Sequence, residues 1–202
     1  SCIVETIPNG TDVSSIQQGG NPELVADILN LQIEDDICVF VGSYDYIANQ
    51  RAAEFIAEMI APEIPDTEFI LAGRNPPEVT GSNVHTPGFV DDLPGLLHLS
   101  DIGLCPITIG SGTNLKILDY LAAGLPIISS ELATVGIDVE NEKSVIIAES
   151  ASEFVESIIK IQSNPTLQSE LQENSRALSR FYDWDVLMSK YNSVVKKLLA
   201  SN

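Results

Sequence analysis

Short apolar runs along the chain alternate with longer segments in which apolar residues recur at helical spacing. The short runs have the length and composition of strands, and the longer segments have the pattern of amphipathic helices. Because continuous apolar strands alternate with helices, the pattern predicts a doubly wound, Rossmann-like α/β fold, with a parallel sheet covered on both faces. The predicted strands are residues 3–7, 37–41, 68–72, 84–85, 102–105, 126–129 and 144–147, and the helices between them are 22–31, 48–61, 93–99 and 113–123.

After the last predicted strand the pattern is helical only. Segments 151–163, 166–180 and 185–199 predict a C-terminal helical tail, and Pro165 marks the first break between them. The stretch 17–23 has the composition of a linker and is expected to join the N-terminal segment to the first covering helix. A chain of 202 residues with this pattern is expected to be one domain that carries a helical tail.

The most informative stretch is residues 110–130, GSGTNLKILDYLAAGLPIISS. It reads as a glycine-rich turn, one helix and a short strand. Ser111 and Thr113 are both good N-cap residues, so the helix is expected to begin near Gly112 or Thr113. A turn that presents free backbone N–H groups at a helix N-terminus is suited to binding phosphate. The alternative is a capped, half-buried helix of the kind found in any α/β domain.

The helix within this stretch carries two charged residues close to its start. Lys116 and Asp119 lie three residues apart, so they are expected on one side of the helix. The ammonium group can bind an anion, and the carboxylate can accept hydrogen bonds from hydroxyls. Gly124 is expected to end the helix, and Pro126 blocks its continuation. The expected buried face consists of Leu115, Leu118, Leu121 and Ala122.

The charge balance excludes one class of ligand. The chain has a net charge of −19, and its ten Lys and Arg residues are scattered along the sequence. Nucleic-acid binding requires clustered basic residues, so we expect no nucleic acid as a partner. No stretch approaches the length of a membrane span. The negative net charge repels an anionic ligand, so the hydrogen-bond donors close to the ligand have to outweigh this repulsion.

The cysteines and histidines do not indicate a metal site. Cys2, Cys38 and Cys105 have neither disulfide nor zinc-ligand spacing, and they are expected to be buried small residues in a reducing compartment. His85 and His98 have no ligand-like spacing to each other. We therefore expect neither a metal nor a cofactor.

The stretch at 110–130 resembles the donor-site motif of retaining glycosyltransferases with the GT-B fold, specifically glycosyltransferase family 4. That family carries two glutamates at a fixed spacing; here Ser111 stands in the place of the first and Asp119 in the place of the second. A branch with Gly-Ser-Gly-Thr-x-Leu-Lys-x-Leu-Glu matches almost residue for residue. The other similar segments follow in the family's order: IPNGTD at 7–12, FVGSYDYIANQ at 40–50, FILAGRNPP at 69–77, VHTPGFVDDLPGLLHLSDIGLCP at 84–106 and FYDWDVLMSKY at 181–191.

The resemblance covers nearly the whole chain and implies a domain organisation. Residues 1–202 would be one nucleotide-sugar-binding domain, with a hinge segment at 1–21 and a helix at 185–202 that crosses back to an N-terminal acceptor domain absent from this chain. Trp184 would be a packing anchor at that crossing. The implied activity is transfer of a sugar from a nucleoside-diphosphate sugar to a glycan, lipid-linked or protein acceptor, with retention of configuration. A cytoplasmic location is expected, and membrane contact through the missing half is left open.

The resemblance also assigns roles to residues. Main-chain amides of Thr113 to Leu115 would hold the donor diphosphate together with Lys116, and Asp119 would accept hydrogen bonds from the ribose. Phe89 and Val90 would border the base. No residue is assigned with certainty to catalysis. The complete set of expected donor-binding residues is Gly42, Ser43, Arg74, Phe89, Val90, Gly110, Ser111, Gly112, Thr113, Asn114, Leu115, Lys116 and Asp119.

The chain departs from the family at two points. Ser43 and Ala48 stand where many members have Arg and Lys, which leaves Lys116, helped by Arg51 or Arg74, to neutralise phosphate. Ser111 replaces an acidic residue, and a hydroxyl cannot act as a carboxylate. Two alternatives therefore stay open: a non-catalytic nucleotide-sugar-binding or interaction module, and a sugar-nucleotide epimerase.

Overall fold

A computed structural model of the chain describes residues 4–110 and 112–200. Its centre is a six-stranded parallel sheet in the order β3-β2-β1-β4-β5-β6. This order confirms the predicted doubly wound α/β fold, since the chain moves outward from β1 in one direction and then from β4 in the other. The strands are β1 Asp36–Val41, β2 Thr67–Ala72, β3 Val84–Gly88, β4 Ile102–Cys105, β5 Ile127–Ser129 and β6 Ile146–Ile147.

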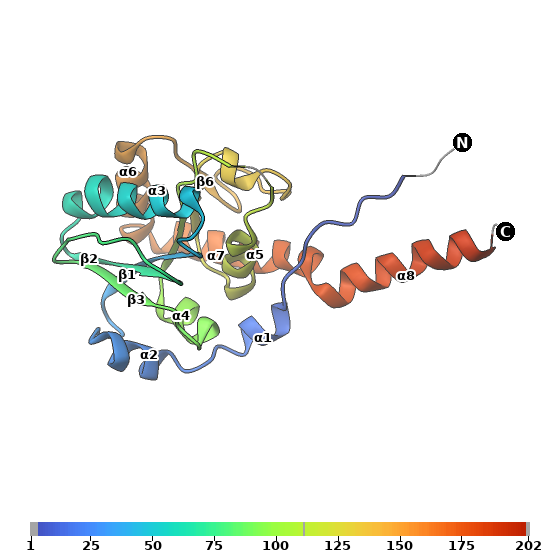
Figure 1. Cartoon of the computed structure of the whole chain (residues 1–202), viewed down its shortest axis with the longest axis horizontal. Helices are drawn as coiled ribbons and strands as arrows, with labels where there is room; N and C mark the ends of the chain where they lie inside the picture. The colour runs from blue at the N-terminus through green and yellow to red at the C-terminus, as the bar shows by residue number, and fades with distance from the viewer. Residues whose placement is uncertain (1–3, 111, 201–202) are drawn as a thin grey trace.

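Helices cover both faces of the sheet (Figure 1). On one face α3 and its continuation pack near α6, and on the other face α2 packs against α4. Four consecutive residues of β1, from Ile37 to Phe40, are buried, as expected for a strand covered on both sides. The helices are α1 Val13–Gln17, α2 Pro22–Leu29, α3 Ile47–Phe55, η1 Ile56–Ile60, η2 Ala61–Glu63, α4 Leu93–Leu99, α5 Leu115–Ala123, η3 Leu132–Thr134, α6 Ala151–Gln162, α7 Pro165–Ser179, η4 Arg180–Tyr182 and α8 Trp184–Ala200.

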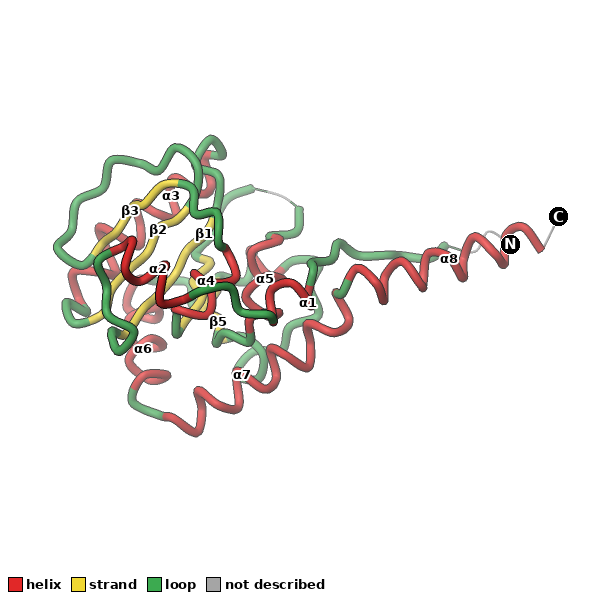
Figure 2. Tube along the Cα trace, turned by 90° about the horizontal axis from the view of Figure 1, so that it is seen from below, coloured by secondary structure: helices red, strands yellow, loops and turns green. Residues whose placement is uncertain are grey.

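The prediction of a strand at 3–7 is wrong for the part of it that the structure describes. Residues 4–10 belong to no strand, and the Val4 side chain is 84% exposed, because this apolar run has no neighbouring strand to pair with. The segment instead runs beside α8, where the Lys190 ammonium donates to the carbonyl of Thr6 at 2.9 Å. Figure 2 shows this segment and α8 leaving the domain together.

A short helix that the sequence pattern did not predict follows this segment. Helix α1 has five residues, and Asp12 caps it by accepting a hydrogen bond from the Ser15 N–H at 2.9 Å. Five residues are too few for helical periodicity to show in a sequence. Just before α1, the Thr11 N–H donates to the Tyr182 carbonyl at 2.9 Å, which joins the N-terminal segment to the start of the α8 region.

The start of α5 also differs from the prediction. The helix begins at Leu115 and its N-cap residue is Asn114, so Thr113 does not cap it; Ser111 lies outside the described residues. The Asn114 side-chain amide donates to the carbonyl of Ala133 at 3.0 Å, and this tertiary contact sets where the helix begins. Leu115, the first residue of α5, is 50% exposed rather than buried. Gly124 ends the helix with φ 76°, as predicted.

Tyr120 connects α5 to the middle of the sheet. Its ring lies over Gly103 of β4, where an added Cβ would come within 2.6 Å of it. Its hydroxyl accepts from the Val41 N–H at 3.0 Å and reaches the Val39 carbonyl at 3.5 Å. The side chain is fully buried, and burial raises the pKa of its hydroxyl well above the ordinary value. Tyr120 therefore fixes the start of α5 relative to the carboxyl end of β1.

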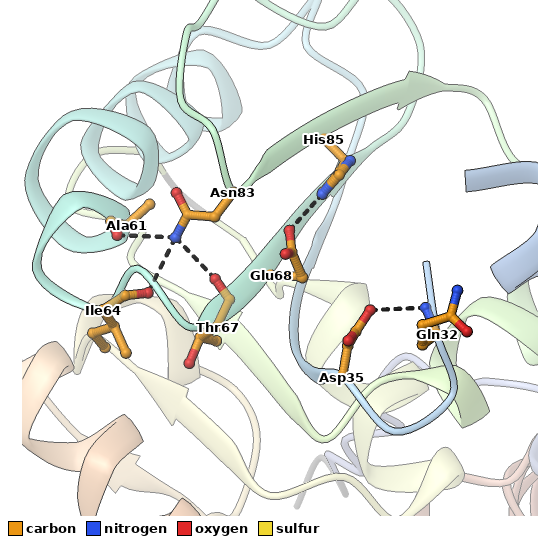
Figure 3. A network of polar contacts seen from close by, with 8 residues as sticks. All are labelled: Gln32, Asp35, Ala61, Ile64, Thr67, Glu68, Asn83 and His85. Carbon is orange, nitrogen blue, oxygen red and sulfur yellow. Dashed lines mark hydrogen bonds and ion pairs between the residues drawn. The ribbon is translucent and has the colours of Figure 1, made fainter. Parts of the chain in front are cut away.

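The buried side-chain amide of Asn83 lies where β2 begins, at the end of the sheet opposite the carboxyl end of β1 (Figure 3). The Asn83 side-chain nitrogen lies 3.0, 3.1 and 2.9 Å from the carbonyl oxygens of Ala61, Ile64 and Thr67. The carbonyls of Ala61 and Ile64 belong to the connection between α3 and β2, and that of Thr67 belongs to the first residue of β2. The amide therefore ties this connection to the start of β2.

Asn83→Asp should destabilise the domain. The substitution keeps the shape of the side chain but turns a donor toward three carbonyl oxygens into an acceptor, at a position that is only 6% exposed. The expected loss of unfolding free energy is about 1–3 kcal/mol, measured by chemical denaturation. The control is Asn192→Asp, the same change on the exposed surface of α8. Equal stability of the two variants would contradict this role of Asn83.

Candidate functional site

The carboxyl ends of the parallel strands meet at one edge of the sheet, and the loops that follow them are held side by side. Gly42, after β1, donates its N–H to the carbonyl of Ala72 at 3.0 Å. Gly73, after β2, donates its N–H to the carbonyl of Gly88 at 2.8 Å. A Cβ on Gly73 would overlap the carbonyl oxygen of Gly42, and Gly73 has φ 146°, so this approach requires glycine. The hydrogen-bond ladder thus continues beyond the strands into the loops.

These loops enclose a hollow of about 440 Å³, called here the β1–β3 cavity. Phe89 stands at its rim with 60% of the side chain exposed, and the Arg74 guanidinium lies 5.3 Å from the centroid of the Phe89 ring. Asp45 also lines it and accepts hydrogen bonds from the Asn75 amide at 2.8 Å and the Ser43 hydroxyl at 3.2 Å. The predicted site residues that line this cavity are Gly42, Ser43, Arg74, Phe89 and Val90.

A second hollow of about 220 Å³ lies beside the glycine-rich turn and is called here the turn cavity. Tyr46 lines it from the loop after β1, so this one loop contributes to both cavities through Ser43 and Tyr46. Of the predicted residues, Gly110, Gly112 and Asn114 line the turn cavity, whereas Thr113 and Leu115 do not. Ser111 lies outside the described residues. The other walls of the turn cavity are apolar: Ile107, Ile109, Leu132 and Val135.

Lys116, in the first turn of α5, extends toward β1 and α3. Its ammonium donates to the Asn49 side-chain oxygen at 2.8 Å and lies 4.6 Å from the centroid of the Phe40 ring. Burial lowers the pKa of this ammonium below its ordinary value. Within the described residues no carboxylate lies within ion-pair distance of it. A largely buried cation with no counter-ion and with N–H groups to spare is suited to receiving an anion.

Asp119 is half-buried on the same helix and has a different neighbour. Its Oδ1 accepts a hydrogen bond from the Thr11 hydroxyl at 2.6 Å. Burial raises the pKa of this carboxyl group, and the bond from Thr11 opposes that shift. Within the described part of the chain, no donor contacts the second carboxylate oxygen, which stays available to another donor. Thr11 lies in the expected hinge segment and was not predicted as a site residue, because nothing local in the sequence indicates a contact with Asp119.

The other expected cations have different surroundings. Arg51 is exposed on α3, and Ala48, at the position of the family's lysine, is buried. Arg74 stacks over Phe89 and forms no ion pair within the described residues. Lys116 is therefore the cation that lies between α5 and the loop after β1, which lines both cavities. Asn49, which holds it, is a second residue that sequence reasoning missed.

The remaining polar candidates have structural partners. His85 pairs with Glu68 at 2.6 Å on the sheet edge (Figure 3), and the His98 ring contacts the carbonyl of Ile16 at 3.0 Å. Cys38 and Cys105 are buried free thiols, as predicted; Cys2 lies outside the described residues. Among the described residues there is no group of three His, Cys, Asp or Glu side chains placed to hold a metal ion. None of the described helices is long and apolar enough to cross a membrane.

Residues 35–164 match the family described as Glycosyl transferases group 1. No curated protein matches the chain significantly. The first similar structures have sequence identities under 20%, so the likeness shows the fold. Sucrose-phosphate synthase from Thermosynechococcus elongatus has TM-score 0.79 and 19% identity, over 98% of this chain and 53% of that one. HepE from Anabaena in complex with UDP has TM-score 0.76 and 15% identity, over 98% of this chain and 57% of that one.

The chain thus spans about half the length of these two proteins. A third structure is the C-terminal domain of a glycosyl transferase group 1 family protein from Francisella tularensis, with TM-score 0.63 and 15% identity. The match covers 90% of this chain and 98% of that domain. The similar part of the longer proteins therefore corresponds in fold to a C-terminal domain.

Proposed function

The chain belongs to the glycosyl transferases group 1 family and has the fold of one Rossmann-like half of a GT-B enzyme, and on that basis we propose that it is the donor-binding half of a retaining glycosyltransferase. This half would bind a nucleoside-diphosphate sugar, whose sugar is then transferred to an acceptor. The observation that carries the proposal is the largely buried Lys116 ammonium, which lacks a carboxylate partner among the described residues and lies next to the glycine-rich turn. HepE, with the same fold, is known in complexes with UDP and with UDP-glucose.

The β1–β3 cavity suggests a place for the base, and the family resemblance suggests one for the phosphates and the ribose, because Lys116 and Asp119 line neither cavity. The base would occupy the β1–β3 cavity against Phe89 and Val90. The diphosphate would lie between the amides of residues 113–115 and Lys116, and the ribose hydroxyls would reach Asp119. The transferred sugar would extend toward the turn at Gly110. This assignment follows the rule that ligands of open α/β sheets bind beyond the carboxyl ends of the strands.

The chemistry of this half would be stabilisation of the leaving diphosphate. As the bond to the sugar breaks, negative charge grows on the phosphate oxygens. The ammonium of Lys116 and the free N–H groups at the start of α5 are fixed in position before this charge develops, which is the arrangement that lowers such barriers. Because Ser43 and Ala48 supply no cations, Lys116 would supply most of the positive charge that stabilises the leaving diphosphate.

An N-terminal half would supply the acceptor site, for a glycan, a lipid-linked sugar or a protein. The described N-terminal segment and α8 leave the domain on the same side, which supports a hinge segment at 1–21 and a crossing helix at 185–202 (Figures 1 and 2). Helix α8 exposes apolar side chains that such a half would cover. They are Trp184, Val186, Met188, Tyr191, Leu198 and Leu199. A cytoplasmic location of the protein would be consistent with its use of a nucleotide-sugar donor.

A second candidate is a non-catalytic nucleotide-sugar-binding module. It is favoured by Ser43 and the buried Ala48, which leave the loop after β1 without the family's cations. Both candidates bind the donor and differ only in transfer. Incubation of the full-length protein with a labelled donor separates them, because only the enzyme consumes the donor in the presence of an acceptor.

We expect the isolated chain to bind a nucleoside diphosphate weakly and to transfer no sugar. Half of a cleft leaves the ligand partly in water, so the dissociation constant should be roughly 10 μM to 1 mM. Calorimetry with UDP-, GDP- and ADP-sugars measures this constant and identifies the base. Absence of binding to all three would contradict the proposed function. Efficient transfer by the isolated chain would contradict the proposal that a second half supplies the acceptor site.

Lys116→Ala should weaken binding of a nucleoside diphosphate much more than binding of the corresponding nucleoside. Hydrogen bonds to charged groups are worth about 1.5–3 kcal/mol, so the expected loss for the diphosphate is roughly ten- to a hundredfold. The matched control is Lys143→Ala, which removes an exposed lysine that pairs with Glu140 and should leave both affinities unchanged. Equal losses for nucleoside and diphosphate in the Lys116 variant would place the ammonium away from the phosphates.

Asp119→Asn should weaken binding of ribonucleotides by about 1–2 kcal/mol, because hydrogen bonds to a charged acceptor are stronger than those to a neutral one. The 2′-deoxy ligand should lose less, since one of its hydroxyls is already absent. The fold should persist, because an amide oxygen can still accept the bond from Thr11. Equal losses for the two ligands, measured by calorimetry, would refute the ribose assignment.

A further inference from the structure

We propose that Asn49 is a positioning residue that aims the Lys116 ammonium at the donor diphosphate and ties it to the loop lining the β1–β3 cavity. This inference rests on the proposed function for the identity of the anion. The contact between Asn49 and Lys116 itself is a property of the folded chain and can be tested without a ligand.

Both polar atoms of the Asn49 side chain are engaged. Its nitrogen donates to the Ser43 carbonyl at 2.7 Å, and its oxygen accepts from the Lys116 ammonium at 2.8 Å. A carbonyl can only accept and an ammonium can only donate, so these two neighbours fix the orientation of the amide. Asn49 is 7% exposed and lies in the first turn of α3, on a rigid element. It thus bridges α5 and the loop after β1.

The loop after β1 is shaped around this amide. A Cβ on Gly42 would come within 2.8 Å of the Asn49 side-chain nitrogen, so the amide packs directly on the Gly42 backbone. Gly42 and Ser43 both line the β1–β3 cavity. The wall of that cavity, the Asn49 amide and Lys116 are therefore connected. A substitution at Asn49 should affect binding of the base and of the phosphates together.

A neutral amide suits this position because it orients the cation without neutralising it. A carboxylate at the same place would form an ion pair with Lys116 and weaken its attraction for phosphate. Asn49 accepts one of the three ammonium N–H bonds and leaves two for a ligand. The other described groups near the ammonium do not neutralise it either. Phe40 offers a ring face, Cys105 on β4 is a thiol whose pKa burial raises to about 11, and Asp119 on the same helix is bonded to Thr11.

The direct test measures the pKa of Lys116 in ligand-free protein by NMR of ¹³Cε-labelled lysine, with Lys116→Arg identifying the signal. Asn49→Asp should raise the pKa of Lys116, because a carboxylate favours the charged form. Asn49→Ala should lower it, because the ammonium loses its acceptor while remaining buried. The control Gln50→Glu adds the same charge one residue along α3 and should have a much smaller effect. Opposite shifts support the proposal.

A purely structural role of Asn49 would shift the Lys116 pKa in one direction in both variants, or in neither, and this result would overturn the proposal. Should Asn49→Ala fail to fold, the isosteric Asn49→Asp decides alone: a raised pKa supports the proposal and an unchanged pKa overturns it. The titration needs no nucleotide, so its outcome is independent of whether the proposed function holds.

A double-mutant cycle then tests the link to the ligand. Asn49→Ala should weaken binding of UDP, or of the diphosphate that the wild-type protein prefers, about tenfold more than binding of its nucleoside. In the Lys116→Ala background the same substitution should add almost no diphosphate-specific loss. Additive losses would show that Asn49 does not act through Lys116 and would overturn the proposal. Failure of the wild-type protein to bind any nucleoside diphosphate would instead refute the proposed function.

Discussion

The packing of α5 against the carboxyl end of β1 is the contact on which the candidate site depends. The Tyr120 ring lies over Gly103, and its hydroxyl accepts a hydrogen bond from the Val41 N–H. These contacts hold α5 against β1 at the point where β1 ends. One turn earlier, Lys116 reaches the ring of Phe40 on the same strand. These contacts hold the glycine-rich turn at a fixed place beside the loop after β1. Both cavities take their relative position from this arrangement.

The same helix carries two charges that folding alone does not favour. Burial lowers the pKa of the Lys116 ammonium and raises that of the Asp119 carboxyl, so in both cases the folded protein disfavours the charged form. At neutral pH both charges therefore cost free energy of folding, and neither has a described partner of opposite charge within ion-pair distance. Such residues are expected at binding sites, where a ligand supplies the missing interactions. The extensive core of the sheet offsets their cost.

The sequence predicted the elements whose signals are local. Strand β4 at Ile102–Cys105 and helix α4 at Leu93–Leu99 have the predicted bounds, because apolar runs and helical spacing are properties of neighbouring residues. The start of α5 was misplaced because Asn114 is held by Ala133, a residue of η3 that follows β5 in the chain. The strand predicted at 3–7, which is absent at the described residues 4–7, shows the same limit, since an apolar run forms a strand only where a partner edge is available.

The candidate site was predicted in outline from the resemblance and completed only by tertiary contacts. The lining residues Gly42, Ser43, Arg74, Phe89 and Val90 were expected and lie together around one cavity. Asn49 and Thr11 were not expected, because their partners Lys116 and Asp119 are 67 and 108 residues away in the sequence. No periodicity or motif connects such pairs. The residues that orient the two charges therefore became visible only in the folded chain.

The most direct test of the central claim is a crystal structure of this chain with the nucleoside diphosphate that it binds most tightly. The account predicts a phosphate oxygen within hydrogen-bond distance of the Lys116 ammonium and the amides of residues 113–115, the ribose at Asp119 and the base against Phe89. Asn49 should still accept from Lys116 in the complex. A diphosphate bound elsewhere on the chain, with Lys116 and Asp119 unchanged and without contact to it, would contradict the account.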